Sequence, residues 1–340
     1  MVSGVTMRNY ARRLLVGLLA TEPLLRRARR KSPPGITVLM YHEVLGDDDS
    51  AEAWTAVRVS ELRRQIEYLK SAVDILSVDE AMSRGDSQRP AAVLTFDDGG
   101  AGNHQHLLPL VEEARVPVTV FVATGHVESG QLYWFDRVVN ALQVDEPLSL
   151  DLRDVGLSTY AVDPPSGADN WAQIQRLLAD IKAAGVERNE ELGALVEKRA
   201  KAAGGAVCAP LQPMTVNQVR ELAACPHVTI GAHSHAHSLL TQMSAADATA
   251  DVAKSRRLLQ QWTGQSVDHF AYPSGGYDAG VRDIVVGCGF RTAFATEKRM
   301  WRPGCDMFAI PRMSIGRYDS ASRFRLALVG GARSVLRAQF

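Results

Sequence analysis

Short apolar runs alternate with amphipathic segments along most of the chain after residue 35. Apolar runs of strand length occur at 36–44, 73–78, 91–96, 117–124, 228–233, 267–273, 291–296 and 307–315. Between them, helical spacing of apolar residues predicts helices at 60–72, 103–116, 245–264 and 279–287, the first capped by Ser60. Strands buried on both faces that alternate with helices are typical of a parallel α/β sheet, and their number favours a (β/α) barrel over an open sheet.

Residues 126–212 interrupt this alternation. The segment is rich in Ala, Glu and Lys, and its apolar residues have helical spacing over 171–185 and 191–204. We expect a mostly helical insertion that caps one end of a barrel formed by residues 36–320. A C-terminal helix is expected at 321–340.

The first 35 residues differ from the rest in charge. They carry eight basic residues and one acidic residue, Glu22, whereas the formal net charge of the whole chain is zero. A chain without net charge has no global field that attracts nucleic acid, so no nucleic-acid partner is expected. The apolar runs in residues 1–35 are too short to span a bilayer. Three interpretations remain: a poor signal peptide without a clear cleavage site, a basic helix that touches an anionic membrane surface, or a plain solvated helix.

Composition and cysteine content indicate an ordinary soluble chain. Hydrophobic residues make up 46 % and charged residues 22 %, as in globular proteins. The four cysteines have no CxxC pair and no spacing typical of a disulfide framework, which favours reduced thiols. We therefore expect a protein that is cytoplasmic, or peripheral at the inner membrane face, rather than exported.

Two carboxylates follow the apolar run 91–96 in the sequence VLTFDDGG. Adjacent side chains on a strand point to opposite faces, so Asp97 and Asp98 can serve one site only where the chain turns. Gly99 and Gly100 supply the conformational freedom for such a turn. In α/β barrels the active site lies at the carboxyl ends of the strands. The alternative is an ordinary polar turn, for which this sequence is equally suitable.

Three histidines alternate in VTIGAHSHAHS, after the apolar run 228–233. On a strand His233, His235 and His237 would share one face, whereas on a helical turn only His233 and His237 would. Together with one carboxylate, two of them would form a three-ligand open centre that suits Zn²⁺ and hydrolysis. The alternative is a polar loop in which the histidines cap neighbouring elements.

The order of these motifs resembles that of the NodB-type polysaccharide deacetylases, carbohydrate esterase family 4, in their exopolysaccharide-associated bacterial branch. The resemblance spans about residues 36–318 and includes MYHEV, LTFDDG, IGAHSHAHSLLTQMS, FAYPSGGYD and FAIPRMSI. It implies a distorted (β/α) barrel and a divalent metal, first of all Zn²⁺, held by Asp98, His233 and His237. It also implies Asp97 as the general base for the attacking water, and it leaves His235 outside the ligand set.

The chain departs from the family pattern at three motifs, and the fourth of the family's motifs is not recognisable in RTAFATEKRMW. In the third motif, Ala271 takes the place of an Arg and Ser274 that of an aromatic residue, while the fifth motif has Arg312 near the place of a catalytic His. A Tyr-His element near the N-terminus of deacetylases acting on poly-N-acetylglucosamine resembles this chain's YHE, which implies His42 as the general acid. Arg312 is the candidate that orients Asp97, and the alternative for it is a plain salt bridge.

Other residues are candidates for contact with substrate. The aromatic residues of 133–135 either line a sugar-binding cleft or pack in the core, and Trp134 is the one we select for the cleft. Tyr272, Pro273 and Ser274 either border the substrate or form a simple turn.

The favoured function is metal-dependent removal of N-acetyl groups from an amino sugar in a polysaccharide or lipid-linked glycan. One alternative is O-deacetylation of an acetylated glycan. Another is a degenerate, non-catalytic glycan-binding protein, which the altered third and fifth motifs suggest. A non-catalytic site has no physical need for Asp97 beside three ligands, which favours the enzyme.

Overall fold

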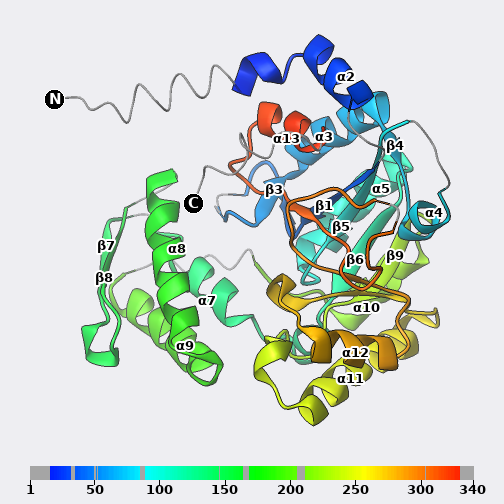
Figure 1. Cartoon of the computed structure of the whole chain (residues 1–340). Helices are drawn as coiled ribbons and strands as arrows, with labels where there is room; N and C mark the ends of the chain where they lie inside the picture. Colours follow the sequence, from blue (N-terminus) through cyan, green and yellow to red (C-terminus); the bar gives the residue numbers. More distant parts are fainter. Residues whose placement is uncertain are drawn as a thin grey trace.

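The computed structural model describes residues 16–31, 35–49, 51, 53–84, 89–144, 146–163, 168–204, 211–302 and 304–329. A curled parallel sheet surrounded by helices forms the larger part, and a mostly helical lobe lies beside it, drawn in green in Figure 1. This is the α/β architecture of a distorted (β/α) barrel, as the sequence predicts.

Eight strands make up the curled sheet. Along its path the order is β11-β10-β9-β6-β5-β1-β12, and β4 pairs with β5 beside this path. Every pair in it is parallel. The strands are β1 (Ile36–Tyr41), β4 (Asp74–Ile75), β5 (Ala91–Phe96), β6 (Val118–Val122), β9 (Val228–Ala232), β10 (His269–Ala271), β11 (Thr292–Phe294) and β12 (Met313–Ser314).

One segment links the two ends of this path, running from β11 at one end to β12 at the other. The amide of Ala295, just after β11, donates to the carbonyl of Ile310 (2.8 Å), and Ile315, just after β12, donates to Met40 in β1 (2.9 Å). Short, irregular pairing of this kind closes the sheet only loosely. The barrel is therefore distorted, and the loop that carries Arg312 lies between its two edges.

Helices cover the outside of the sheet because each presents one apolar face to strands that are buried on both sides. They are α3 (Val59–Ala72), α4 (Val78–Ser83), α5 (Leu108–Ala114), α10 (Val216–Ala224), α11 (Ala245–Thr263), α12 (Ala279–Gly287) and α13 (Ala321–Ala327). A π-helical stretch, η1 (Asn103–Leu107), precedes α5 within the helix expected at 103–116. The cap expected at Ser60 is wrong: α3 begins at Val59, and its N-cap residue, Arg58, makes no side-chain cap hydrogen bond.

The apolar run 36–44 does not form one strand. β1 ends at Tyr41, and β2 (Glu43–Leu45) pairs instead with β3 (Ala56–Arg58) in a separate two-stranded sheet. His42 lies at the break between them. The run 307–315 likewise contributes only β12 at its end, so Arg312 precedes a strand rather than ending one.

The insertion expected at 126–212 is mostly helical, but it also contains a β-hairpin. Its elements are α6 (Thr124–Ser129), α7 (Trp134–Ala141), β7 (Leu148–Asp151), a short 3₁₀ helix (Arg153–Val155), β8 (Thr159–Val162), α8 (Ala168–Ala183) and α9 (Val186–Ala202). Apart from α6, whose Val127 packs in the barrel core, they enclose an apolar core of their own, which also takes in residues of the segment after β1: Leu45 of β2, Ala53, and Ala56 of β3. The first barrel loop therefore anchors the insertion to the barrel.

Both ends of the described chain meet on one side of the barrel. The N-terminal helix α2 (Glu22–Lys31) lies beside α13 in Figure 1. Of the basic segment 1–35, residues 1–15 and 32–34 lie outside the described residues, and of the helix expected at 321–340 so do residues 330–340. Cys225, Cys288 and Cys305 are free thiols, while Cys208 lies outside the described residues.

Candidate active site

The turn after β5 separates two neighbouring carboxylates. Asp97 donates its amide proton to the carbonyl of Tyr41 in β1 (2.9 Å), which continues the strand pairing for one residue. Asp98 and Gly99 then both have positive φ angles, 72° and 79°. A left-handed conformation at two successive residues reverses the chain direction, so the two carboxylates no longer alternate as they would on a strand. The hydroxyl of Tyr133 donates to the carbonyl of Asp98 (2.6 Å) and holds this turn.

The loop after β9 carries the three histidines and is similarly strained. Ser234 and His237 have φ angles of 65° and 54°, and the Ser234 hydroxyl accepts a hydrogen bond from the amide of His237 (2.9 Å). Buried Asp251 on α11 accepts the amides of His235 and Ala236, at 2.8 and 2.9 Å. Strained non-glycine residues persist only where the surroundings hold them, and they concentrate at functional sites.

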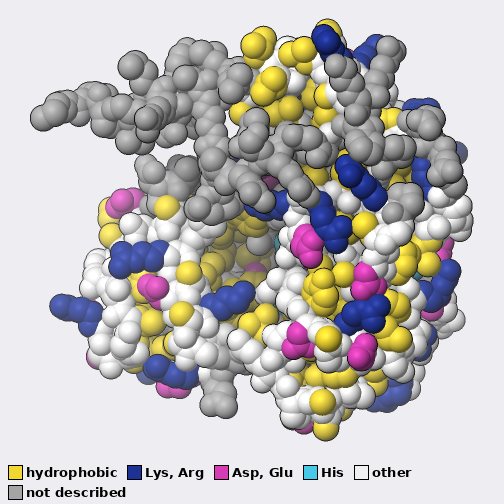
Figure 2. All heavy atoms as spheres, in the orientation of Figure 1, with side chains coloured by type: hydrophobic (Ala, Val, Ile, Leu, Met, Phe, Trp, Pro, Cys, Tyr) yellow, Lys and Arg dark blue, Asp and Glu magenta, His cyan; other side chains and the backbone are white. Residues whose placement is uncertain are grey.

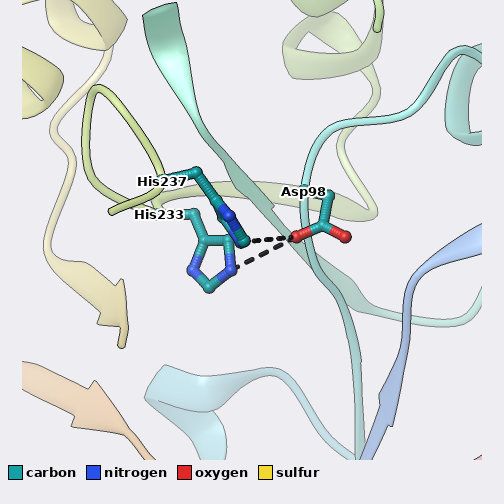
Figure 3. Close-up of side chains that lie close together, drawn as sticks. All are labelled: Asp98, His233 and His237. Carbon is teal, nitrogen blue, oxygen red and sulfur yellow. Dashed lines mark ion pairs between the residues drawn. The ribbon is translucent and has the colours of Figure 1, made fainter. Parts of the chain in front are cut away.

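Asp98, His233 and His237 converge on one point (Figure 3). One donor atom from each lies within 4.8 Å of the others. Oδ1 of Asp98 is 3.4 Å from Nε2 of His233 and 3.2 Å from Nε2 of His237. Ligands of a tetrahedral zinc ion are about 3.3 Å apart when each lies about 2.0 Å from the metal. The donor set and its spacing therefore fit a divalent metal with an open fourth position.

Hydrogen bonding leaves Nε2 of His233 available as a donor atom to a metal. Its Nδ1 lies 2.7 Å from the carbonyl oxygen of Ala271, which accepts only from a protonated nitrogen. The proton on Nδ1 leaves a lone pair on Nε2 of the neutral ring, directed at Asp98 and the open position. Ala271, in the place of the family's Arg, thus contributes a backbone acceptor.

The charges at this cluster oppose the effect of burial. Burial raises the pKa of Asp98, but hydrogen bonds with His233 and His237 outweigh it and hold that pKa well below its usual value. Burial lowers the pKa of His233, yet Asp97 and Asp98 raise it overall. For His237 burial prevails over Asp98 and lowers the pKa. Asp98 is therefore ionised at neutral pH, as a metal ligand must be.

Asp97 does not join the donor cluster but forms a paired contact with Arg312. The two guanidinium nitrogens lie 2.6 and 2.7 Å from Oδ1 and Oδ2 of Asp97. Both side chains are buried, at 0 and 3 % exposure, and the Arg312 guanidinium lies over the rings of Phe121 and Phe294. Burial raises the pKa of Asp97, but the charges of Arg312 and His233 lower it overall. Arg312 thus binds both oxygens of the Asp97 carboxylate and fixes its orientation.

His42 lies on the same rim because β1 and β5 pair in register up to Tyr41 and Phe96. A positive charge on His42 is the smallest of the causes that lower the pKa of Asp97 and of Asp98, after the nearer partners of each carboxylate. Nδ1 of His42 is buried and makes no hydrogen bond among the described residues. The next residue, Glu43, is a buried carboxyl that the sequence did not single out. A Cβ added to Gly100 would lie only 2.1 Å from Oε2 of Glu43, so a glycine at position 100 leaves room for this side chain.

His235 points away from the donor cluster. Its Nδ1 is 2.9 Å from the hydroxyl of Thr124, and its Nε2 is 2.7 Å from Nζ of Lys254. Both ring nitrogens are engaged, so neither is free for a metal. The loop geometry, rather than a strand or helix, thus brings together the first and third histidines.

The aromatic residues of the insertion divide between the site and the lobe. The rings of Tyr133 and Phe135 lie 4.9 and 5.5 Å from that of His237. Trp134 instead packs against the core of the insertion. Gly193 of α9 lies close to it, since a Cβ added to this glycine would be 3.1 Å from the carbonyl oxygen of Trp134. The two neighbours of Trp134, rather than Trp134, therefore form the wall beside the candidate metal site.

The loop after β10 contributes Ser274 to the edge of the site. Tyr272 is fully buried, and its hydroxyl donates to the carbonyl of Phe308 (3.0 Å). Pro273 is buried as well, whereas Ser274 adopts a φ angle of 55°. Its hydroxyl accepts from Lys182 of α8 at 3.3 Å, so the insertion reaches across to the barrel. Figure 2 shows a hollow with hydrophobic walls between the lobe and the barrel.

Comparison with known proteins agrees with this geometry. No curated protein sequence matches the chain significantly. The fold is similar to that of the deacetylase PplD of Streptococcus pyogenes (TM-score 0.57, 16 % identity, covering 87 % of this chain and 99 % of that one). It is also similar to IcaB of Ammonifex degensii (0.57, 18 %, 88 % and 98 %) and a de-N-acetylase of Aggregatibacter actinomycetemcomitans (0.54, 15 %, 86 % and 99 %).

Structural likeness at such low sequence identity shows the fold alone, whereas a match to a family model shows the family. The model of the polysaccharide deacetylases matches residues 84–293, a span that includes Asp97, Asp98, His233 and His237. Residues 84–293 are more than half of the chain. The chain therefore belongs to the polysaccharide deacetylase family and is a carbohydrate deacetylase.

Proposed function

We propose that the protein is a metal-dependent N-deacetylase that releases acetate from an N-acetylated amino sugar in a polysaccharide or a lipid-linked glycan. The observation that carries the proposal is the convergence of Asp98, His233 and His237 beside a separate carboxylate, Asp97, that Arg312 holds in place. Bound there, a divalent ion of the Zn²⁺ type would polarise the acetyl carbonyl and lower the pKa of water.

Asp97 is the proposed general base. Its lowered pKa keeps it ionised at neutral pH, and it lies 4.0 Å from Nε2 of His233 without belonging to the donor cluster. Arg312 binds both carboxylate oxygens, which fixes the plane of the carboxylate. Since each oxygen has a second lone pair, Asp97 still accepts a proton from water that attacks the acetyl carbon.

His42 is the proposed general acid, and this role favours amide over ester hydrolysis. An amine leaves an amide only after its nitrogen has been protonated, whereas an ester oxygen leaves with less assistance. His42 directly follows β1, as Asp97 directly follows the paired strand β5, and the buried Nδ1 of His42 has no partner among the described residues. That one of the proteins with a similar fold is a de-N-acetylase also supports N-deacetylation.

The substrate is proposed to lie in the hollow between lobe and barrel (Figure 2). Phe135, partly exposed beside His237, offers aromatic surface, which suits the apolar face of a pyranose ring, while buried Tyr133 packs behind it. Ser274 and Lys182 supply polar groups at the opposite edge. The role of Trp134 as a stacking residue has less support because its ring packs toward the insertion.

The test is acetate release from soluble N-acetylglucosamine oligomers, with and without a chelator. We expect activity that the chelator removes and Zn²⁺ or another divalent ion restores. Asp97→Asn and His42→Ala should each lower kcat by about 10²–10⁴-fold. His104→Ala is the matched control, since His104 pairs with Glu221 on the surface (2.6 Å).

Three results would contradict the proposal. Acetate release from O-acetylated sugars alone would establish the esterase. Glycan binding without acetate release from any acetylated sugar would establish a binding protein. Full activity of His42→Ala would remove the acid assignment alone.

A further inference from the structure

The N-terminal helical segment, residues 16–31, has one side packed on the barrel. Ala20 and Leu25 are 3 and 1 % exposed, and they form a small apolar cluster with Leu326 and Val329 next to α13. The hydroxyl of Tyr68 in α3 also donates to Glu22 (3.2 Å). The segment is therefore held in a defined orientation, and its other side faces outward.

Two leucines lie on that outward side. Leu18 is 62 % and Leu24 40 % exposed, and among the described residues only two other large hydrophobic side chains, Val286 and Tyr318, are similarly exposed. Single exposed apolar side chains are common, and what distinguishes this segment is that it carries two of them close to arginines. Figure 2 shows hydrophobic side chains gathered on the upper edge of the molecule, beside Lys and Arg side chains, where Figure 1 places α2.

Positive charge borders these leucines. Arg26 and Arg27 are exposed, and Arg26 pairs with Glu22, the one acidic residue of the first 35 (3.1 Å). Arg27 makes no ion pair or hydrogen bond among the described residues. Arg29, Arg30 and Lys31 follow in the sequence. The outward surface, formed by Leu18, Leu24, Arg26 and Arg27, is called the N-terminal surface below.

We propose that the N-terminal surface binds an anionic lipid bilayer at its headgroup region. The leucines enter the boundary between headgroups and acyl chains, and the arginines contact lipid phosphates. A second copy of the chain is a poor occupant, because two such surfaces would bring like charges together. The contact is peripheral: no helix among the described residues has the length and apolar character needed to cross a bilayer.

The test is co-sedimentation of the full chain with lipid vesicles. One set contains phosphatidylcholine alone and the other about 30 % phosphatidylglycerol, at about 0.1 M salt. We expect binding to the anionic vesicles and little to the neutral ones. Arg26→Gln with Arg27→Gln should weaken binding by roughly tenfold or more, as should Leu18→Asp with Leu24→Asp.

Matched controls separate this contact from folding and catalysis. Val286→Asp changes an exposed apolar residue of α12, far from α2 in Figure 1, and should bind the vesicles like the unmodified chain. All variants should retain their circular dichroism and release acetate from soluble oligomers at the unmodified rate. Equal binding to both vesicle types, unchanged binding of the variants, or a dimer that the leucine substitutions dissociate would overturn the proposal.

Discussion

Two buried histidines on neighbouring strands, one just after the carboxyl end of β9 and the other at the start of β10, show what distinguishes the candidate active site. The first is His233 and the second is His269. They are 2 and 1 % exposed. Burial lowers the pKa of each, but Asp97 and Asp98 reverse this effect and raise the pKa of His233. The pKa of His269 remains lowered despite Asp79, 3.8 Å away.

The difference lies in the surroundings rather than in burial. Nδ1 of His269 contacts the Thr292 hydroxyl at 2.8 Å, and its carboxylate partner, Asp79, is 56 % exposed to solvent. Around His233 two carboxylates and a second imidazole converge from loops with strained backbone. A cluster of groups that shift one another's pKa is a sign of a functional site, whereas a buried histidine alone is not.

The largest expected effect is loss of activity on removal of a candidate ligand. His233→Ala should lower the rate of acetate release by about 10³-fold or more, because the site loses a metal donor. His269→Gln should leave the rate within about threefold and lower stability by about 1 kcal/mol through the lost Thr292 contact. Metal content by elemental analysis accompanies both assays. Equal losses of activity in the two variants would contradict the difference in role between His233 and His269.

A second contrast concerns two arginines, Arg312, which pairs with Asp97, and Arg291, which pairs with Asp79. Arg312→Ala leaves Asp97 buried and unpaired, so we expect a loss of about 3–5 kcal/mol in the free energy of unfolding. Arg291→Ala removes a pair with Asp79 at 2.8 Å, in which both side chains are more than half exposed. It should cost less than about 1 kcal/mol. Urea unfolding measures both, and similar values would contradict the assigned difference in burial.

The two histidines should influence stability with opposite pH dependence when chelator is present. A lowered pKa in the folded state means that His269 contributes fully above the unfolded value of about 6.5, and less as the pH falls below it. His233, with its raised pKa, contributes fully below about 6.5 and loses that contribution as the pH rises through its folded value. The free energy of unfolding that each variant loses relative to the unmodified chain should therefore become smaller toward low pH for His269→Gln and larger for His233→Gln. Unfolding measured from about pH 5 to pH 8 tests the signs.

The smallest expected effect concerns His235, between the two candidate ligands. Its ring contacts Thr124 and Lys254 rather than the donor cluster. His235→Asn should retain metal and keep activity within about threefold, with a loss of stability of about 1 kcal/mol. Loss of metal comparable to that of His237→Asn would place His235 among the ligands instead.

Much of the fold follows from local patterns. Buried parallel strands are continuous apolar runs, so 91–96, 117–124 and 228–233 correspond closely to β5, β6 and β9. The carboxylates and histidines of the candidate site come directly after two of these strands, and parallel strands bring their carboxyl ends to the same edge. Position along the chain was therefore sufficient to predict that Asp98 and His233 meet.

Other features had weaker local signals. The hairpin β7–β8 is not among the elements expected in the insertion. Its strands, Leu148–Asp151 and Thr159–Val162, alternate between buried and exposed residues, which is the two-residue period of half-exposed strands. The break at His42 had no signal, because MYHEV remains apolar enough for one strand. It arises from a choice of partners: β1 pairs with β5, and β2 with β3.

The alternation of strands and helices can be predicted from the sequence alone, because apolar periodicity and turn residues act locally. The order of the motifs is likewise a property of the sequence. Tertiary structure decided which side chains share a site. Only packing joins Arg312 to Asp97, 215 residues apart, turns His235 away, and brings Tyr133 and Phe135, rather than Trp134, beside His237. Such contacts depend on loop conformation and side-chain direction, which local sequence does not specify.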